Sequence, residues 1–369
     1  MNEGAVDAMC RTARVVVTCG TGGVGKTSVA AALGLHAARL GRRAVVVTID
    51  PARRLADAIG MGEALGDEPT RVGLEAPGEM WVCMLDVGGT FDRLVADTAP
   101  DAARVREVTE NAFYRSLSRS LSGTRDYMAA ERLYELSRDP RFDLVIVDTP
   151  PSRNALDFLE SPERLARFLR HPLVRMMMAS GRGGLRLASA AAAPVLRAVS
   201  TVVGTDALEG AMAFLRAFDG MQHEFTRRAG EVAHLLRGDT TAFVVVTAPS
   251  PAALDDAGHF VAELARLGVP LRLVVANRMP PDFGAVSPEA EERLATATTG
   301  GVGAVHGWLA GLARDAEAAR EGSASFLART HDLFPLAARV EAEEFATDIH
   351  DMGSITVLAD ELAGRRTRQ

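Results

Sequence analysis

The stretch of sequence that decides the fold is Gly20-Thr21-Gly22-Gly23-Val24-Gly25-Lys26-Thr27-Ser28. It follows an apolar run at residues 15–19 that is typical of a buried strand, and it opens a helical pattern from residue 29. In this context the pattern G-x-x-x-x-G-K-[ST] binds phosphate, because backbone N–H groups and the helix N-terminus surround the anion. Lys26 is placed to reach the β- and γ-phosphates, and the Thr27 hydroxyl to bind Mg²⁺. The stretch therefore predicts a nucleoside triphosphate site.

The composition is that of an ordinary globular protein. The 369 residues, 47% hydrophobic and 24% charged, suffice for one large α/β domain or for a core with an inserted subdomain. The net charge of -7 offers no basic field, so we expect no nucleic-acid partner. Cys10, Cys19 and Cys83 lack the spacing of a metal site or a disulfide framework, which predicts no zinc and suits a reducing cytosol. With neither an apolar leader nor 18 consecutive apolar residues, we expect a cytoplasmic protein.

Short runs rich in Val, Leu and Ile predict the strands of a parallel sheet. They are Arg14–Cys19, Ala44–Asp50, Met80–Leu85, Leu144–Asp148, Ala242–Ala248 and Leu271–Asn277, with a last strand expected around Asp332–Leu336. Helical patterns separate most of them, which indicates an α/β fold with a doubly wound, mostly parallel P-loop NTPase sheet.

The spacing of the strands also predicts a division into parts. More than ninety residues without a convincing strand separate Asp148 from Ala242, which is far longer than an ordinary crossover. We therefore expect a core formed by residues 14–160 and 240–369, a helical insertion subdomain at 161–239, and flexible termini at 1–13 and 364–369.

Two aspartates end predicted strands, at the edge of the sheet where the Gly20 loop also lies. Asp148 is typical of a Walker-B carboxylate that holds Mg²⁺ directly or through water. Asp50 is the candidate for positioning the attacking water in hydrolysis. Each aspartate alone is as typical of a helix N-cap, but together with the loop they favour a catalytic site.

Three segments taken together resemble one family. Gly20–Ser28, Asp50-Pro51-Ala52 and Asp148-Thr149-Pro150-Pro151-Ser152 are similar to the P-loop and the two switch segments of ArsA-type ATPases. That family includes the arsenite-pump motor and the ATPase of guided entry of tail-anchored proteins. The resemblance implies ATP as substrate with Mg²⁺, Asn277 as the residue that contacts adenine, and Pro335 and Leu336 near the base.

The same resemblance has implications for assembly. Members of the family are dimers that close around two ATP molecules and open after hydrolysis, and their helical subdomain binds cargo or a partner. Residues 133–136 and 151–159 are similar to actinobacterial ArsA-like proteins encoded as unequal pairs. This implies a heterodimer with a paralogous subunit, with a homodimer as the alternative.

Two positions depart from the family's pattern. The family's loop begins Gly-Lys-Gly-Gly, and that lysine reaches across the dimer, whereas this chain has Thr21. A neutral hydroxyl cannot neutralise transition-state charge, so hydrolysis is slow, or a partner or another residue supplies the cation. Arg153 stands where relatives tend to carry glycine and is a candidate arginine finger, with a surface arginine as the alternative. Arg53 and Arg54 are weaker candidates of the same kind.

The predicted insertion carries a local reversal of charge. Residues 164–205 contain seven arginines and neither Asp nor Glu, and Met176–Met178 add adaptable apolar surface. This pattern is typical of a groove for hydrophobic cargo or of a contact with a membrane surface, which would make the protein peripheral to a membrane. Packing of the subdomain by these apolar residues, with arginines covering it, explains the pattern equally.

Two functions remain open. One is an ATP-driven dimeric switch, favoured by Lys26, Asp50 and Asp148. The other is a catalytically weak nucleotide-binding subunit that completes the site of a paralogous ATPase, favoured by Thr21. A GTPase is disfavoured, because residues 277–280 do not supply the Asn-Lys-x-Asp motif that reads guanine.

Overall fold

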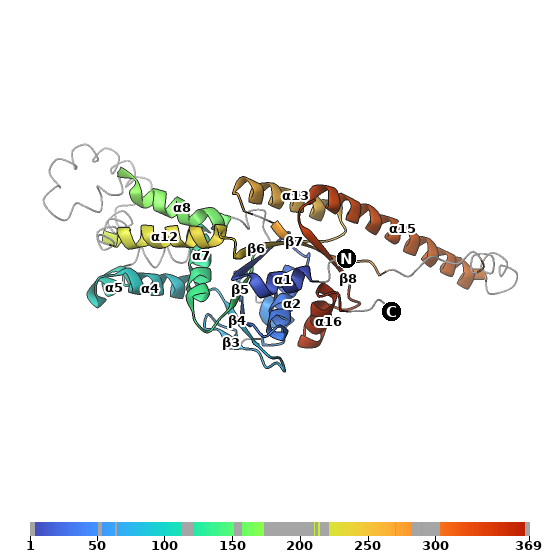
Figure 1. Ribbon diagram of the computed structural model, residues 1–369, viewed down its shortest axis with the longest axis horizontal. Coiled ribbons are helices and arrows are strands. Elements are labelled where there is room, and N and C mark those ends of the chain that lie inside the picture. Colours follow the sequence, from blue (N-terminus) through green and yellow to red (C-terminus); the bar gives the residue numbers. More distant parts are fainter. Residues whose placement is uncertain are drawn as a thin grey trace.

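The computed structural model describes residues 4–50, 54–62, 65–111, 122–150, 157–172, 210, 213–214, 221–269, 271–281, 289 and 303–365. An eight-stranded sheet crosses the middle of the molecule in the order β3-β4-β2-β5-β1-β6-β7-β8 (Figure 1). The strands are β1 Val15–Cys19, β2 Arg43–Thr48, β3 Thr70–Arg71, β4 Glu79–Met84, β5 Leu144–Asp148, β6 Thr241–Thr247, β7 Leu271–Met279 and β8 Ala338–Glu343. All neighbours pair in parallel except β3 with β4. The mostly parallel α/β sheet predicted from the sequence is confirmed.

Both faces of the sheet are covered by helices, which is why its central strands are apolar throughout. Successive side chains of a strand point to opposite faces, so each strand divides its residues between two cores. Val16 and Val46 belong to a core with α1 (Ala5–Thr12), α2 (Lys26–Arg39), α3 (Arg54–Ala58) and α16 (Met352–Leu362). Val17 and Val47 belong to a core with α7 (Ser122–Arg138), α12 (Gln222–Arg237), α13 (Pro251–Arg266) and α15 (Gly303–Leu333).

A third core lies in a lobe of helices beside the sheet. It joins α4 (Val87–Thr98), α5 (Ala102–Thr109) and α8 (Asp157–Arg170) to parts of α7 and α12, through buried side chains such as Phe91, Tyr127 and Phe225. These five helices lie together on one side of the sheet, while α15 extends beyond the other side (Figure 1). The lobe therefore draws on residues before 161 as well as within 161–239. Residues 173–200, which include Met176–Met178, lie outside the described residues.

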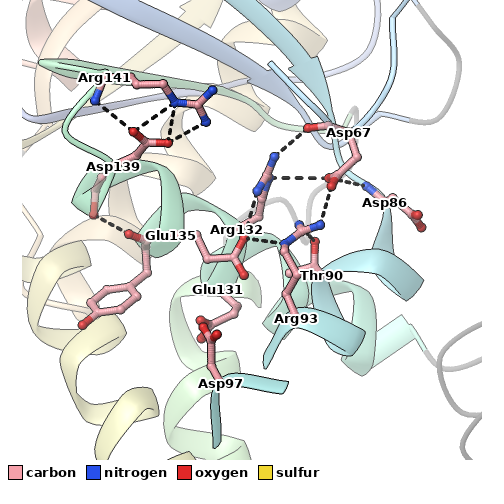
Figure 2. A network of polar contacts seen from close by, with 12 residues as sticks. Asp67, Asp86, Thr90, Arg93, Asp97, Glu131, Arg132, Glu135, Asp139 and Arg141 are labelled. Carbon is pink, nitrogen blue, oxygen red and sulfur yellow. Dashed lines mark hydrogen bonds and ion pairs between the residues drawn. The ribbon is translucent and has the colours of Figure 1, made fainter. Parts of the chain in front are cut away.

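A polar network ties this lobe to the edge of the sheet (Figure 2). Asp67, in the segment between α3 and β3, accepts from Arg93 of α4 at 2.6 Å, and its backbone carbonyl accepts from Arg132 of α7 at 2.6 Å. Glu135 accepts from both arginines, at 3.3 and 2.9 Å. The carboxylates of Asp67 and Glu135 thus fix the positions of α4 and α7 relative to the segment that follows α3.

Two expectations about chain segments are wrong. The last strand is β8 at 338–343 and not 332–336, because the helical pattern continues to Leu333 and ends two residues before Pro335. Residues 5–12, expected in a flexible terminus, form α1, whose Val6, Met9 and Cys10 are buried against the core. Within the described segments, no helix combines the length and apolarity needed to cross a bilayer.

Candidate nucleotide-binding site

The predicted phosphate loop connects β1 to α2, and Lys26 is the first residue of that helix. Gly20 and Gly25 have φ angles of 151° and 89°, which favour glycine. A Cβ atom at Gly20 would clash with the carbonyl oxygen of Val246, and one at Gly25 with the amide of Asn277. No side chain caps the N-terminus of α2. Its first N–H groups are therefore available to an anion, as phosphate binding requires.

Lys26 lies inside the loop it follows. Its Nζ donates to the carbonyl oxygen of Thr21 at 2.7 Å, and the residue is only 5% exposed. Burial lowers the pKa of Lys26, and the charge of Asp148 opposes that shift. A partly desolvated ammonium group next to free helix donors interacts strongly with phosphate, because water screens it less.

Asp148, at the end of β5, forms the second half of the site. Its Oδ2 accepts from the hydroxyls of Thr27 at 2.9 Å and Thr48 at 3.0 Å, while its Oδ1 is buried without a hydrogen-bond partner. Burial raises the pKa of Asp148 to about 6, and the two hydroxyls and Lys26 oppose that rise. Thr48 was not predicted from the sequence, although its position two residues before Asp50 places it at the same strand end.

These groups fit a magnesium ion. Mg²⁺ prefers hard oxygen ligands, and the Thr27 hydroxyl beside an unpartnered oxygen of Asp148 supplies two of them. The described part of the chain holds no group of three or more His, Cys, Asp or Glu residues suited to a metal. A P-loop magnesium site needs fewer protein ligands, because phosphate oxygens and waters complete the coordination.

Asp50 reaches the same edge from the end of β2. It is 7% exposed, and its backbone N–H donates to the Thr48 hydroxyl at 3.2 Å. Arg54, at the start of α3, places its Nη1 at 3.7 Å from Asp50 Oδ2. The structure thus brings Asp50 and Asp148 together at one strand-end edge. Pro51, Ala52, Arg53 and Arg153 lie outside the described residues.

A cavity of about 520 Å³ is lined by Lys26, Thr27 and Asp50 among these groups. Its walls come from the phosphate loop, from Asp50 and Arg54, from Thr149 after β5, from Asn277 and Arg278 near the end of β7, and from residues 343–349 after β8. All of these lie at the carboxyl ends of parallel strands, where α/β sheets bind ligands. The volume lies within the range of small-molecule sites.

Of the residues that the family resemblance predicts to contact the base, Asn277 lines the cavity, whereas Pro335 and Leu336 do not. Asn277 lies in the cavity wall, and its Nδ2 donates to the carbonyl oxygen of Val24 at 2.8 Å. Pro335 and Leu336 precede β8 and therefore lie at the amino edge of the sheet, opposite the phosphate loop; Leu336 is 98% exposed. Their assignment to the base is wrong, because the strand was placed too early. The alternation of apolar and charged residues over 338–343, whose Val340 and Ala342 are buried, is the sequence signal that would have located the strand.

Sequence comparison agrees with this geometry. The profile of the anion-transporting ATPase (ArsA) family matches residues 13–294. The chain belongs to this family. The matched region of this ArsA-family chain includes the phosphate loop, Asp50, Asp148 and Asn277, so the resemblance inferred from those residues is confirmed.

Several proteins are similar to this ArsA-family chain. An uncharacterized protein of Streptomyces coelicolor is 31% identical over 271 residues, which cover 73% of this chain and 63% of that protein. ATPase get3 of Schizosaccharomyces pombe is 26% identical over 287 residues, 74% of this chain and 76% of that protein. ATPase ARSA1 of Chlamydomonas reinhardtii is 25% identical over 284 residues, 70% of this chain and 34% of that protein. The chain therefore covers less than two thirds of the Streptomyces and Chlamydomonas relatives.

Proposed function

We propose that this protein binds Mg·ATP in the cavity at the carboxyl ends of the strands and hydrolyses it to ADP and phosphate. One observation carries the proposal: Lys26, Thr27 and Asp148 lie together at an uncapped helix N-terminus, and the carboxylate keeps one buried oxygen unpartnered. That combination suits a magnesium-bound phosphate. Without such a ligand, a buried carboxylate oxygen that lacks a hydrogen-bond partner is unfavourable. Membership of an ATPase family supports the same conclusion.

Each residue has a distinct role in the proposed reaction. Asp50 accepts a hydrogen bond from the attacking water and orients its oxygen toward the γ-phosphorus. A new O–P bond forms while the bond from the γ-phosphorus to the bridging oxygen breaks, and that electron pair leaves with ADP. The proton lost by the water passes to the phosphate product or to solvent. Lys26 neutralises charge on the transferred group. Thr27 and Asp148 would hold a magnesium ion, which would supply further neutralisation when bound.

The proposed assembly is a dimer with a paralogous ArsA-like subunit or with a second copy, on the basis of the family resemblance. A second function, a weak subunit that completes a partner's site, is favoured by Thr21. That residue contributes a backbone carbonyl to Lys26 and no positive charge. Arg153 remains a proposed source of the missing cation, in cis or across the dimer.

The proposed partner surface lies on the helical lobe. A groove of about 590 Å³ between α8 and α12 is lined by Arg167, Arg170, His234 and Arg237, with Glu163 on its rim beside Arg237. Phe168 on α8 is 54% exposed. These features support the proposal that residues 164–205 contact hydrophobic cargo or an anionic membrane surface. Co-sedimentation with anionic liposomes tests the membrane version, which fails if binding does not exceed that to neutral liposomes.

Calorimetry and single-turnover hydrolysis test the main proposal. We expect wild type to bind Mg·ATP, Asp50→Asn to bind it but to hydrolyse it about 100-fold more slowly, and Asp148→Asn to lose the magnesium dependence of binding. Asp255→Asn, at an exposed position of α13 outside the cavity, is the matched control and should behave as wild type. Wild type that binds no Mg·ATP would refute the proposal. Wild type that binds it but turns over only with an added partner subunit would establish the second function.

A further inference from the structure

Arg278 has an unusual backbone conformation. Its φ angle is 57°, and among the described residues it is the only non-glycine residue with a positive φ. The left-handed region is unfavourable for a long side chain, because its Cβ crowds the backbone. Such strain persists only where the surrounding structure imposes it, and it gathers at ligand sites.

The surrounding structure here is a bulge in β7. Ala276 pairs with Glu341 and the next pair is Met279 with Glu343, so β7 contains one residue more than β8 over this stretch. Asn277 and Met279 are buried on either side, whereas Arg278 is exposed and lines the nucleotide cavity. The bulge therefore turns the arginine out of the strand ladder and into the cavity wall.

The order of the strands shows which end of the cavity this is. The phosphate loop follows β1 at the centre of the sheet, and Asp148 and Asp50 lie to one side, after β5 and β2. Since the magnesium ligands and the water-positioning carboxylate mark the γ-phosphate end, the nucleoside must extend toward β7 and β8. Arg278 lies at that end, where Phe345 also lines the cavity.

We propose that Arg278 binds the nucleobase, with its guanidinium covering one face of the ring. A guanidinium is planar and weakly hydrated, so it stacks on flat π systems better than an ammonium does. Among the residues that the structure describes, no carboxylate forms an ion pair with Arg278, so no such contact holds its guanidinium away from the cavity. The left-handed backbone conformation of Arg278 directs its side chain toward the cavity. This inference rests on the proposed function, because it assigns one residue of the same nucleotide site.

Calorimetry with two probes, Mg·ATP and Mg·tripolyphosphate, tests the assignment, since tripolyphosphate lacks the base and ribose. Asn tolerates the left-handed conformation without a guanidinium, so Arg278→Asn should raise the Kd for Mg·ATP about tenfold and leave that for tripolyphosphate unchanged. Without ligand, the variant should melt at the wild-type temperature or above it, because strain is relieved. Arg278→Lys should lose most of the ATP affinity as well. Arg272→Asn, an exposed arginine near the other end of β7, is the matched control.

The possible outcomes separate the two proposals. If wild type binds neither probe, the proposed function fails and the inference fails with it. If wild type binds both and Arg278→Asn retains full ATP affinity, or loses affinity for both probes equally, only the assignment of Arg278 to the base is refuted. Full affinity in Arg278→Lys would refute stacking, and a lower melting temperature for Arg278→Asn would refute the strain argument.

Discussion

Glu131 on α7 should make the stability of the helical lobe depend on pH. It is fully buried, its Oε1 accepts from Arg228 Nε at 2.6 Å, and Tyr127 donates to its other oxygen at 3.4 Å. Burial raises the pKa of Glu131 from 4.5 to about 7, although the charge of Arg228 opposes the rise. Replacing it by glutamine keeps the shape and polarity of the group and removes the titration.

The magnitude follows from the two pKa values. Because the folded protein holds this proton more tightly than the unfolded chain, protonation stabilises the fold below pH 4.5, and that contribution is lost as the pH rises through about 7. Between pH 5 and pH 8 the lost contribution amounts to about 2–3 kcal/mol of unfolding free energy. Glu131→Gln should lack this loss, so the stability of wild type relative to the variant should fall by that amount.

Equilibrium urea unfolding at the two pH values, followed by circular dichroism, measures the difference. Comparing wild type with Glu131→Gln at each pH cancels the titration of all other groups. Glu317→Gln, an exposed glutamate paired with Arg320, is the control and should show the same pH dependence as wild type. If the stability of Glu131→Gln relative to wild type changes by less than about 0.5 kcal/mol between the two pH values, the reasoning about burial is refuted.

Two further substitutions test the geometry directly. Gly25→Ala forces a side chain into a left-handed turn beside a buried amide, so thermal unfolding should show a loss of about 1–3 kcal/mol and calorimetry a loss of Mg·ATP binding. Gly230→Ala, a helical glycine with open space around its Cβ, should match or exceed wild-type stability, and equal stability of the two variants would contradict the prediction. Asp67→Ala leaves Arg93 and Arg132 (Figure 2) with Glu135 but without the carboxylate of Asp67, and should cost about 2–3 kcal/mol in urea unfolding. Asp255→Ala, which removes an exposed ion pair with Arg329, should cost less than about 1 kcal/mol of unfolding free energy. A similar loss of stability for both aspartate variants would show that the network adds nothing to the stability of the fold.

The local sequence pattern was sufficient to predict those segments whose conformation depends mainly on their own residues. The valine-rich runs of β1, β2 and β5 form strands because β-branched side chains pack well on a buried sheet. The loop from Gly20 to Ser28 is equally local, since the required glycines stand at fixed positions in the motif. Aspartates at the ends of parallel strands could be placed at one edge because all such strands end on the same side.

The sequence by itself determined the central strands of the sheet and the phosphate loop, and it predicted Lys26, Thr27, Asp50 and Asp148 as site residues, because each depends on short-range periodicity or on a fixed spacing. Only the tertiary structure decided which segment after β8 lines the cavity, that the Thr48 hydroxyl donates to Asp148, and that a bulge places Arg278 in the cavity wall. It also decided that the lobe is built from helices on both sides of β5. These features depend on register and on contacts between segments distant in the sequence, and no local pattern encodes either.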